Sequence, residues 1–114
     1  MMTKKHHALF VCSANLQRSP TAERAFQNWK DMWETRSAGT MPVKNRQPLT
    51  QELIDWADVI IVMETYHAGY ILSNFQTDKT KIKVLDIADV YYRDDPELIR
   101  QLEMKVPPFL QSFK

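Results

Sequence analysis

The sequence predicts an α/β fold, a four-stranded parallel sheet with helices on both faces. Two observations support this prediction. Short apolar runs without polar alternation are typical of strands buried on both faces, and they occur at residues 8–11 and 59–63, with a further strand expected at residues 82–85. Segments with helical spacing of apolar residues separate these runs, and such alternation favours right-handed crossovers that join parallel strands.

The length and composition are those of one globular domain, which we expect to span residues 1–114. The apolar fraction of 44% and the charged fraction of 25% are ordinary for a folded domain. The net charge of +1 creates no overall field that would attract nucleic acid or an anionic membrane. We therefore expect neither of these partners, and any anion site must be local.

The single cysteine, Cys12, rules out an intrachain disulfide, which fits a reducing compartment. Residues 1–7 are polar and basic, without the apolar stretch and cleavage site of a signal peptide. We therefore expect a cytoplasmic location. The adjacent His6 and His7 have no partners at metal-ligand spacing, so we expect a solvated chain end, no metal site and no cofactor.

The first half of the chain opens with the strand at residues 8–11. Ser19 before Pro20 predicts a helix start, with serine at the N-cap and proline at the first helical position. Apolar residues then recur at helical spacing through Phe26, and a second strand is expected at residues 35–37.

The second half repeats the alternation. Thr50 and Thr65 each favour the start of a helix, on either side of the buried strand at residues 59–63. After the fourth strand, Asp95-Pro96 predicts the last helix, which Pro107-Pro108 interrupts. Three tryptophans are expected on helices, in packing roles: Trp29, Trp33 and Trp56.

The loop between Cys12 and Pro20 is the chemically informative segment. Cys12 ends the first strand, five residues intervene, and Arg18 stands just before the helix start. A loop curled around an anion can point successive backbone N–H groups inward, and the helix adds the positive end of its dipole. Arg18 supplies a planar cationic fork that grips two phosphate oxygens. These features predict a phosphate-binding loop after the first strand.

In such a loop the thiolate of Cys12 is favoured over the thiol, and the thiolate is a nucleophile. Asn15 tolerates the left-handed conformation that a tight loop requires. Ser19 is expected to cap the helix, and its hydroxyl can also hydrogen-bond the Cys12 sulfur. A lone cysteine at a strand end is more often a small buried apolar residue, but its coincidence with Arg18 and a Ser-Pro helix start favours catalysis.

The motif Cys-x5-Arg-Ser after a first strand resembles the signature of the low-molecular-weight protein tyrosine phosphatases, which also include thioredoxin-linked arsenate reductases. The chain is most similar to a compact bacterial branch of that family. Further resemblances to its segments follow in chain order at residues 18–23, 37–40, 57–64 and 89–92. The chain departs from the family pattern at Ala14 (usually glycine), Gln17 (often cysteine) and Val90 (proline).

The resemblance implies a phosphomonoesterase that forms a cysteinyl-phosphate on Cys12, with Arg18 holding the phosphate and Asp89 as general acid. Its substrate would be a phosphorylated protein or a small aryl phosphate, and inorganic phosphate or a similar anion would occupy the loop. Substrate-binding positions would be the rest of the loop and two tyrosines: Ser13, Ala14, Asn15, Leu16, Gln17, Ser19, Tyr91 and Tyr92.

Several alternatives stay open at this stage. Asp95 is more readily explained as a helix cap and Asp86 as a turn residue than as the acid. Tyr91 and Tyr92 either flank the site or cover the core. His67 is expected to be an ordinary helix-surface residue. Instead of a phosphatase, the chain could be an arsenate reductase that uses an external thiol, or a phosphate-binding module without turnover.

Overall fold

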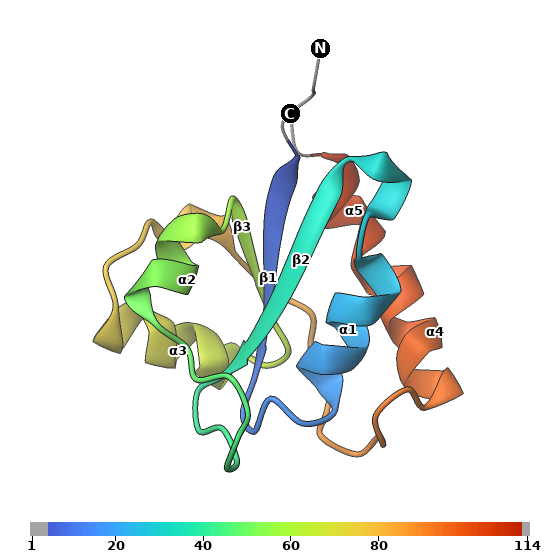
Figure 1. Ribbon diagram of the computed structural model, residues 1–114, viewed down its shortest axis with the longest axis horizontal. Coiled ribbons are helices and arrows are strands. Elements are labelled where there is room, and N and C mark those ends of the chain that lie inside the picture. The colour runs from blue at the N-terminus through green and yellow to red at the C-terminus, as the bar shows by residue number, and fades with distance from the viewer. Residues whose placement is uncertain (1–4, 113–114) are drawn as a thin grey trace.

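The structure, a computed structural model, describes residues 5–112. Its centre is a four-stranded parallel sheet with the strand order β2-β1-β3-β4 (Figure 1). The strands are β1 (His6–Cys12), β2 (Trp33–Gly39), β3 (Val59–Val62) and β4 (Ile82–Val84). The predicted fold class is therefore confirmed.

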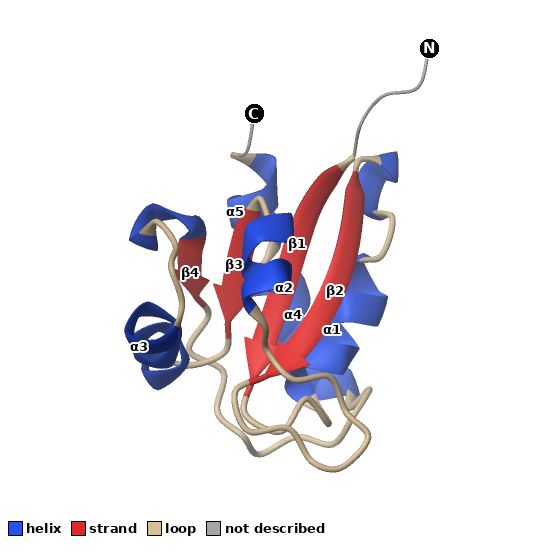
Figure 2. Cartoon of the chain, turned by 60° about the vertical axis from the view of Figure 1, so that its left-hand side comes forward, coloured by secondary structure: helices blue, strands red, loops and turns tan. Residues whose placement is uncertain are grey.

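Helices cover both faces of the sheet (Figures 1 and 2). One face carries α1 (Arg18–Phe26), α4 (Pro96–Lys105) and α5 (Pro107–Gln111), and the other carries α2 (Gln51–Trp56) and α3 (Thr65–Asn74). Two single-turn 3₁₀ helices, η1 (Trp29–Asp31) and η2 (Lys79–Lys81), precede β2 and β4. Within residues 5–112, no helix combines the length and apolarity needed to span a bilayer.

The alternating side chains of β1 divide the core into two layers. Ala8 and Phe10 pack with the α1 and α4 side, whereas Leu9 and Val11 pack with the α2 and α3 side. All of these residues are fully buried, because a central parallel strand is covered on both faces. This explains why the strand reads as a continuous apolar run in the sequence.

The carboxyl ends of the parallel strands meet at one edge of the sheet, which is the lower edge in Figure 2. Cys12 ends β1 there and pairs in register with Gly39, the last residue of β2. Open α/β sheets bind their ligands at this edge. The topology thus brings the loop after β1 to the place where the fold is expected to carry a site.

Several predicted helix starts are confirmed. Thr50 caps α2 by accepting a hydrogen bond from Leu53 N–H at 3.2 Å. Asp95 caps α4 by accepting one from Glu97 N–H at 2.9 Å, with Pro96 in the first turn. The break at the double proline is also present, since α4 ends at Lys105 and α5 begins at Pro107.

Other local predictions are wrong. Helix α1 starts at Arg18, and within residues 5–112 its N-cap, Gln17, makes no capping hydrogen bond through its side chain. Ser19 lies inside the first turn, where its hydroxyl contacts the Cys12 sulfur. Glu64, not Thr65, is the N-cap of α3. Trp33 is not helical but begins β2, where it is buried against the α1 side of the core.

The end of β2 allows no side chain at Gly39. A Cβ there would lie 2.5 Å from the Ser13 carbonyl oxygen and 2.9 Å from the Asn15 nitrogen, both backbone atoms of the loop that leaves β1. The loop can therefore cross β2 at this distance only over a glycine.

We predict that Gly39→Ala destabilises the protein by about 1–3 kcal/mol, the usual cost of overpacking. Gly69→Ala is the matched control, because a Cβ at Gly69 in α3 would meet nothing within 4 Å. That change should instead stabilise the helix by roughly 0.5–1 kcal/mol. Urea denaturation of both variants tests the prediction, which is contradicted if Gly39→Ala is as stable as the unchanged protein.

Candidate active site

The loop after β1 turns its carbonyl groups outward. The carbonyls of Cys12, Ser13 and Ala14 accept hydrogen bonds at 2.8 to 3.2 Å from the backbone N–H groups of residues 40, 41 and 43, respectively. These donors belong to the segment after β2, which runs along the outside of the loop. A strand-like set of contacts therefore holds the first half of the loop.

Side chains hold the second half. The carbonyl of Asn15 accepts from Arg46 Nε at 2.6 Å, and that of Leu16 accepts from Arg93 Nε at 2.7 Å. The carbonyl of Gln17 accepts from the Thr21 backbone N–H at 3.1 Å and its hydroxyl at 2.7 Å. Every carbonyl from residue 12 to residue 17 thus has a partner outside the loop.

This arrangement leaves the backbone N–H groups of the loop facing the other way. In a planar trans peptide, the carbonyl of one residue and the N–H of the next point in opposite directions. Among the described residues, 5–112, no hydrogen-bond acceptor pairs with the N–H groups of residues 13–17. Successive inward N–H groups of this kind make an anion-binding concavity.

A pocket of about 100 Å³ lies inside the loop, and its lining includes the cysteine, the arginine and the candidate acid. The lining residues are Cys12, Ala14, Leu16, Gln17, Arg18 and Asp89. The other loop residues predicted to bind substrate, Ser13, Asn15 and Ser19, lie outside this lining. Their backbone and side chains shape the loop.

Asn15 adopts the left-handed conformation that the sequence indicated, with φ of 54°. Its buried side chain donates hydrogen bonds of 3.0 Å to the hydroxyls of Ser19 and Ser37. Its side-chain oxygen accepts from the Gln47 backbone N–H at 3.1 Å. Because that N–H can only donate, the orientation of the amide is determined.

The Cys12 sulfur lies 2.9 Å from the Ser19 hydroxyl oxygen. Ser19 already accepts from the Asn15 amide, so its own proton is available for the sulfur, which is closer than the Ala38 carbonyl at 3.5 Å. The Ser19 hydroxyl thus connects the Asn15 amide to the sulfur at the end of β1. The alternative role considered for Ser19, a helix cap, is not observed.

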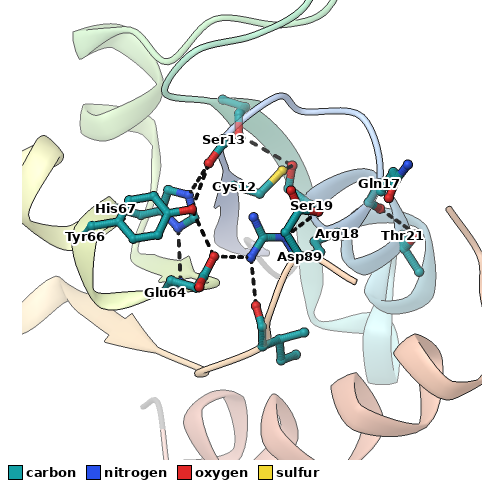
Figure 3. A network of polar contacts seen from close by, with 12 residues as sticks. Cys12, Ser13, Gln17, Arg18, Ser19, Thr21, Glu64, Tyr66, His67 and Asp89 are labelled. Atoms are coloured by element: carbon teal, nitrogen blue, oxygen red, sulfur yellow. Dashed lines mark hydrogen bonds and ion pairs between the residues drawn. The ribbon is translucent and has the colours of Figure 1, made fainter. Parts of the chain in front are cut away.

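Arg18 is a buried cation held in place by three groups (Figure 3). One terminal nitrogen donates to Glu64 Oε2 at 2.6 Å and to the Ile87 carbonyl at 2.7 Å, and Nε lies 3.7 Å from Asp89 Oδ1. Burial disfavours its charge, but the hydrogen bond to Glu64 and the charge of Asp89 help to outweigh burial and raise the pKa of Arg18. The same hydrogen bond lowers the pKa of Glu64.

The three aspartates considered at the sequence level lie in different settings. Asp89 lines the pocket with a largely exposed side chain near Arg18. Asp95 caps α4, as described above. Asp86 is exposed in a left-handed turn with φ of 58°, where its carbonyl accepts from Lys105 Nζ. The geometry therefore brings only Asp89, of these three, to the pocket.

The two tyrosines after Asp89 differ from each other. Tyr91 is half-buried against the apolar layer on the α1 and α4 side, whereas Tyr92 is 78% exposed. Neither lies in the lining of the pocket. Tyr91 thus packs on the core, whereas Tyr92 is exposed to solvent.

The expectation for His67 is wrong: it is fully buried and belongs to the site (Figure 3). Its Nδ1 accepts from the Glu64 backbone N–H at 3.1 Å, so the proton of the neutral ring is on Nε2, which lies 2.9 Å from Ser13 Oγ. Periodicity could not reveal this role, although the spacing of Glu64 and His67 is that of a helix N-cap and its third helical position.

The hydrogen bonds of this cluster run in one direction. His67 Nε2–H donates to Ser13, whose hydroxyl lies 3.1 Å from the Tyr66 oxygen, and the Tyr66 hydroxyl donates to Glu64 Oε2 at 2.9 Å. Glu64 Oε2 also accepts a hydrogen bond from Arg18. The chain of donors therefore links α3 and the loop to the carboxylate that orients Arg18.

Comparisons with known proteins support the fold. No sequence family and no curated protein matches the chain at a significant level. Among solved structures, the low-molecular-weight protein tyrosine phosphatase of T. tengcongensis has a TM-score of 0.82 at 20% identity, covering 96% of this chain and all of that one. Wzb of Vibrio vulnificus, in complex with benzylphosphonate, has a TM-score of 0.78 at 21% identity, with 96% and 99% covered.

A third match is the YwlE arginine phosphatase of Geobacillus stearothermophilus, with a TM-score of 0.70, 24% identity and coverage of 96% and 98%. Both kinds of phosphatase therefore share the architecture of this chain. The chain has the fold of the low-molecular-weight phosphatases, as the sequence resemblance implied.

His67 should make stability depend on pH. Burial and the nearby charge of Arg18 lower the pKa of His67 from 6.5 to about 4. Between these values the unfolded chain binds the proton and the folded chain does not, so stability falls as the pH drops from 6.5 toward 4. The loss for this group is about 3 kcal/mol at most.

His67→Gln removes the titrating ring and keeps a side chain that can donate to Ser13. We predict that urea denaturation between pH 7 and pH 4 shows a smaller loss of stability for this variant than for the unchanged protein. His6 and His7 are retained in both proteins and serve as the internal control. Identical pH dependence in the two proteins would contradict the role assigned to His67.

Proposed function

We propose that the protein is a cysteine-dependent phosphatase that hydrolyses phosphotyrosine in proteins. The observation that supports the proposal is the small pocket, about 100 Å³, whose lining combines Cys12, Arg18 and Asp89 with the inner side of the loop. A binding module requires the N–H groups and the cation. It requires neither a nucleophile nor an acid beside them.

The proposed reaction has two steps. The Cys12 thiolate attacks phosphorus, the bond to the leaving oxygen breaks, and Asp89 gives that oxygen a proton. Arg18 and the loop N–H groups hold the equatorial oxygens, where the negative charge is spread in the transition state. Asp89, now ionised, then takes a proton from water, which attacks the cysteinyl-phosphate and releases inorganic phosphate and the Cys12 thiolate.

The surroundings of the pocket favour an aromatic phosphate on a protein. Tyr66, Val90 and Tyr92 are 57%, 72% and 78% exposed, and all are neighbours of the site in the chain or in space. Aromatic and apolar side chains pack on a phenyl ring. The thiolate mechanism also requires that Cys12 stay reduced, which supports a cytoplasmic location.

Arginine phosphatases share this fold, so substrate preference needs a direct test. We expect release of phosphate from a phosphotyrosine peptide at least tenfold faster than from phosphoarginine, because the exposed rim residues suit an aromatic ring. Equal or faster release from phosphoarginine contradicts the choice of substrate. Thiol-dependent arsenate reduction without phosphate release would instead favour the reductase.

The roles of Cys12 and Arg18 are tested together. Cys12→Ser should abolish hydrolysis of para-nitrophenyl phosphate while inorganic phosphate still binds, since the loop N–H groups remain. Arg18→Lys should lower turnover about a hundredfold or more, because lysine keeps the charge but loses the two-oxygen grip. Phosphate release is the measurement, with circular dichroism to confirm folding. Normal turnover of folded Cys12→Ser would refute the mechanism.

Asp89 and Asp95 should show opposite signatures. Asp89→Asn should reduce turnover strongly on phenyl phosphate and less on para-nitrophenyl phosphate, whose leaving group needs little protonation. Asp95→Ala should keep turnover and lose roughly 0.5–2 kcal/mol of stability with its cap. Rate measurements on both substrates, combined with thermal melting, separate the two roles. If Asp95→Ala abolishes turnover and Asp89→Asn does not, the assignment is wrong.

A further inference from the structure

Arg93 connects the segment that carries Asp89 to the phosphate-binding loop. Its Nε donates to the Leu16 carbonyl at 2.7 Å, although the two residues are 77 positions apart in the chain. Arg93 stands only four residues after Asp89, between β4 and α4. One side chain therefore spans the two segments that hold the proposed acid and the proposed anion site.

Two neighbouring contacts support the same connection. The backbone N–H of Asp94 donates to the Thr21 hydroxyl at 2.9 Å, and Arg24 donates to both carboxylate oxygens of Asp94 at 2.5 Å. Thr21 also donates to the Gln17 carbonyl. Residues 93 and 94 are thus attached to both the loop and the helix that follows it.

The segment has a second attachment on the other side of Asp89. The Ile87 N–H donates to the Met63 carbonyl, and the Ile87 carbonyl accepts from Arg18. Between these attachments, within the described chain, residues 88–92 have few polar contacts: the Asp89–Arg18 ion pair and the Tyr92 carbonyl, which accepts from Asp95 N–H. Val90 does not restrict φ as a proline would. The position of Asp89 therefore depends on how both ends are held.

The contact also orients one peptide group of the loop. The Leu16 carbonyl and the Gln17 N–H belong to the same planar peptide and point in opposite directions. By holding the Leu16 oxygen outside the loop, Arg93 directs the Gln17 N–H toward the pocket. Arg46 acts in the same way on the preceding peptide, but it comes from a segment that carries no candidate acid.

We propose that Arg93 is a positioning residue that clamps the segment bearing Asp89 onto the phosphate-binding loop, so that acid and anion site are aligned by one contact. This inference rests on the proposed phosphatase function. Arg93 is not itself a lining residue of the pocket, and it contacts the lining only through the outward carbonyl of Leu16. Its effect is on the direction of the Gln17 N–H and on the placement of Asp89.

The test compares Arg93→Ala, Arg93→Lys and Arg100→Ala. Arg100 is the matched control, because it is also an exposed arginine but pairs with Glu97 on its own helix, α4. We expect Arg93→Ala to bind inorganic phosphate roughly three- to tenfold more weakly, the size of one lost hydrogen bond. Its turnover of phenyl phosphate should fall about tenfold, part of what a positioned acid contributes, and that of para-nitrophenyl phosphate should fall less.

Arg93→Lys should recover part of both losses, since lysine can still donate one hydrogen bond to the Leu16 carbonyl, and Arg100→Ala should match the unchanged protein. The proposal is overturned if Arg93→Ala behaves like Arg100→Ala, or if its turnover falls equally on the two substrates. If the unchanged protein hydrolyses neither substrate, the phosphatase function fails. In that case, phosphate affinity measured by calorimetry tests the proposed role of Arg93 separately from catalysis. Equal affinity of Arg93→Ala and the unchanged protein overturns that role.

Discussion

The outward direction of the carbonyl groups at residues 12–17 is the constraint on which the site depends. A planar peptide cannot turn its N–H inward unless its carbonyl turns outward, and an outward carbonyl that is shielded from water costs free energy unless it accepts a hydrogen bond. The chain supplies those partners from the segment after β2, from Arg46, from Arg93 and from Thr21. The shape of the loop is therefore a property of the whole edge of the sheet.

The buried polar groups of the site show the same dependence. Arg18 is nearly inaccessible to solvent, and a buried cation without partners would be very costly. Glu64 at the start of α3 and the Ile87 carbonyl after β4 provide those partners. On the opposite side of the loop, the Asn15 amide donates a hydrogen bond to the Ser19 hydroxyl, and that hydroxyl contacts the Cys12 sulfur. These hydrogen bonds leave the polar side chains of the site few alternative partners. They therefore favour a single conformation of the loop.

Different segments at the edge of the sheet hold the loop from different sides. Residues from β2 and the segment after it hold the loop from one side, and α3 holds Arg18 and Ser13 from the other (Figure 3). The segment after β4 carries Asp89 across the remaining side. Because the strand order places β1 between β2 and β3, all of these segments reach the loop without a long connection.

The sequence by itself determined the sheet, the loop and its central residues. Local sequence is enough to predict a buried strand such as residues 8–11 and a helix cap such as Thr50 or Asp95. The spacing from Cys12 to Arg18 can also be read directly from the chain. Tertiary structure alone decided the partners. His67 looks like a surface residue in its helical pattern, and the local sequence around Arg46 and Arg93 indicates no partner, yet each of the three bonds a loop residue between 31 and 77 positions away. Hydrogen bonds over such separations leave no periodic signal, because the fold and not the local chain brings their atoms together.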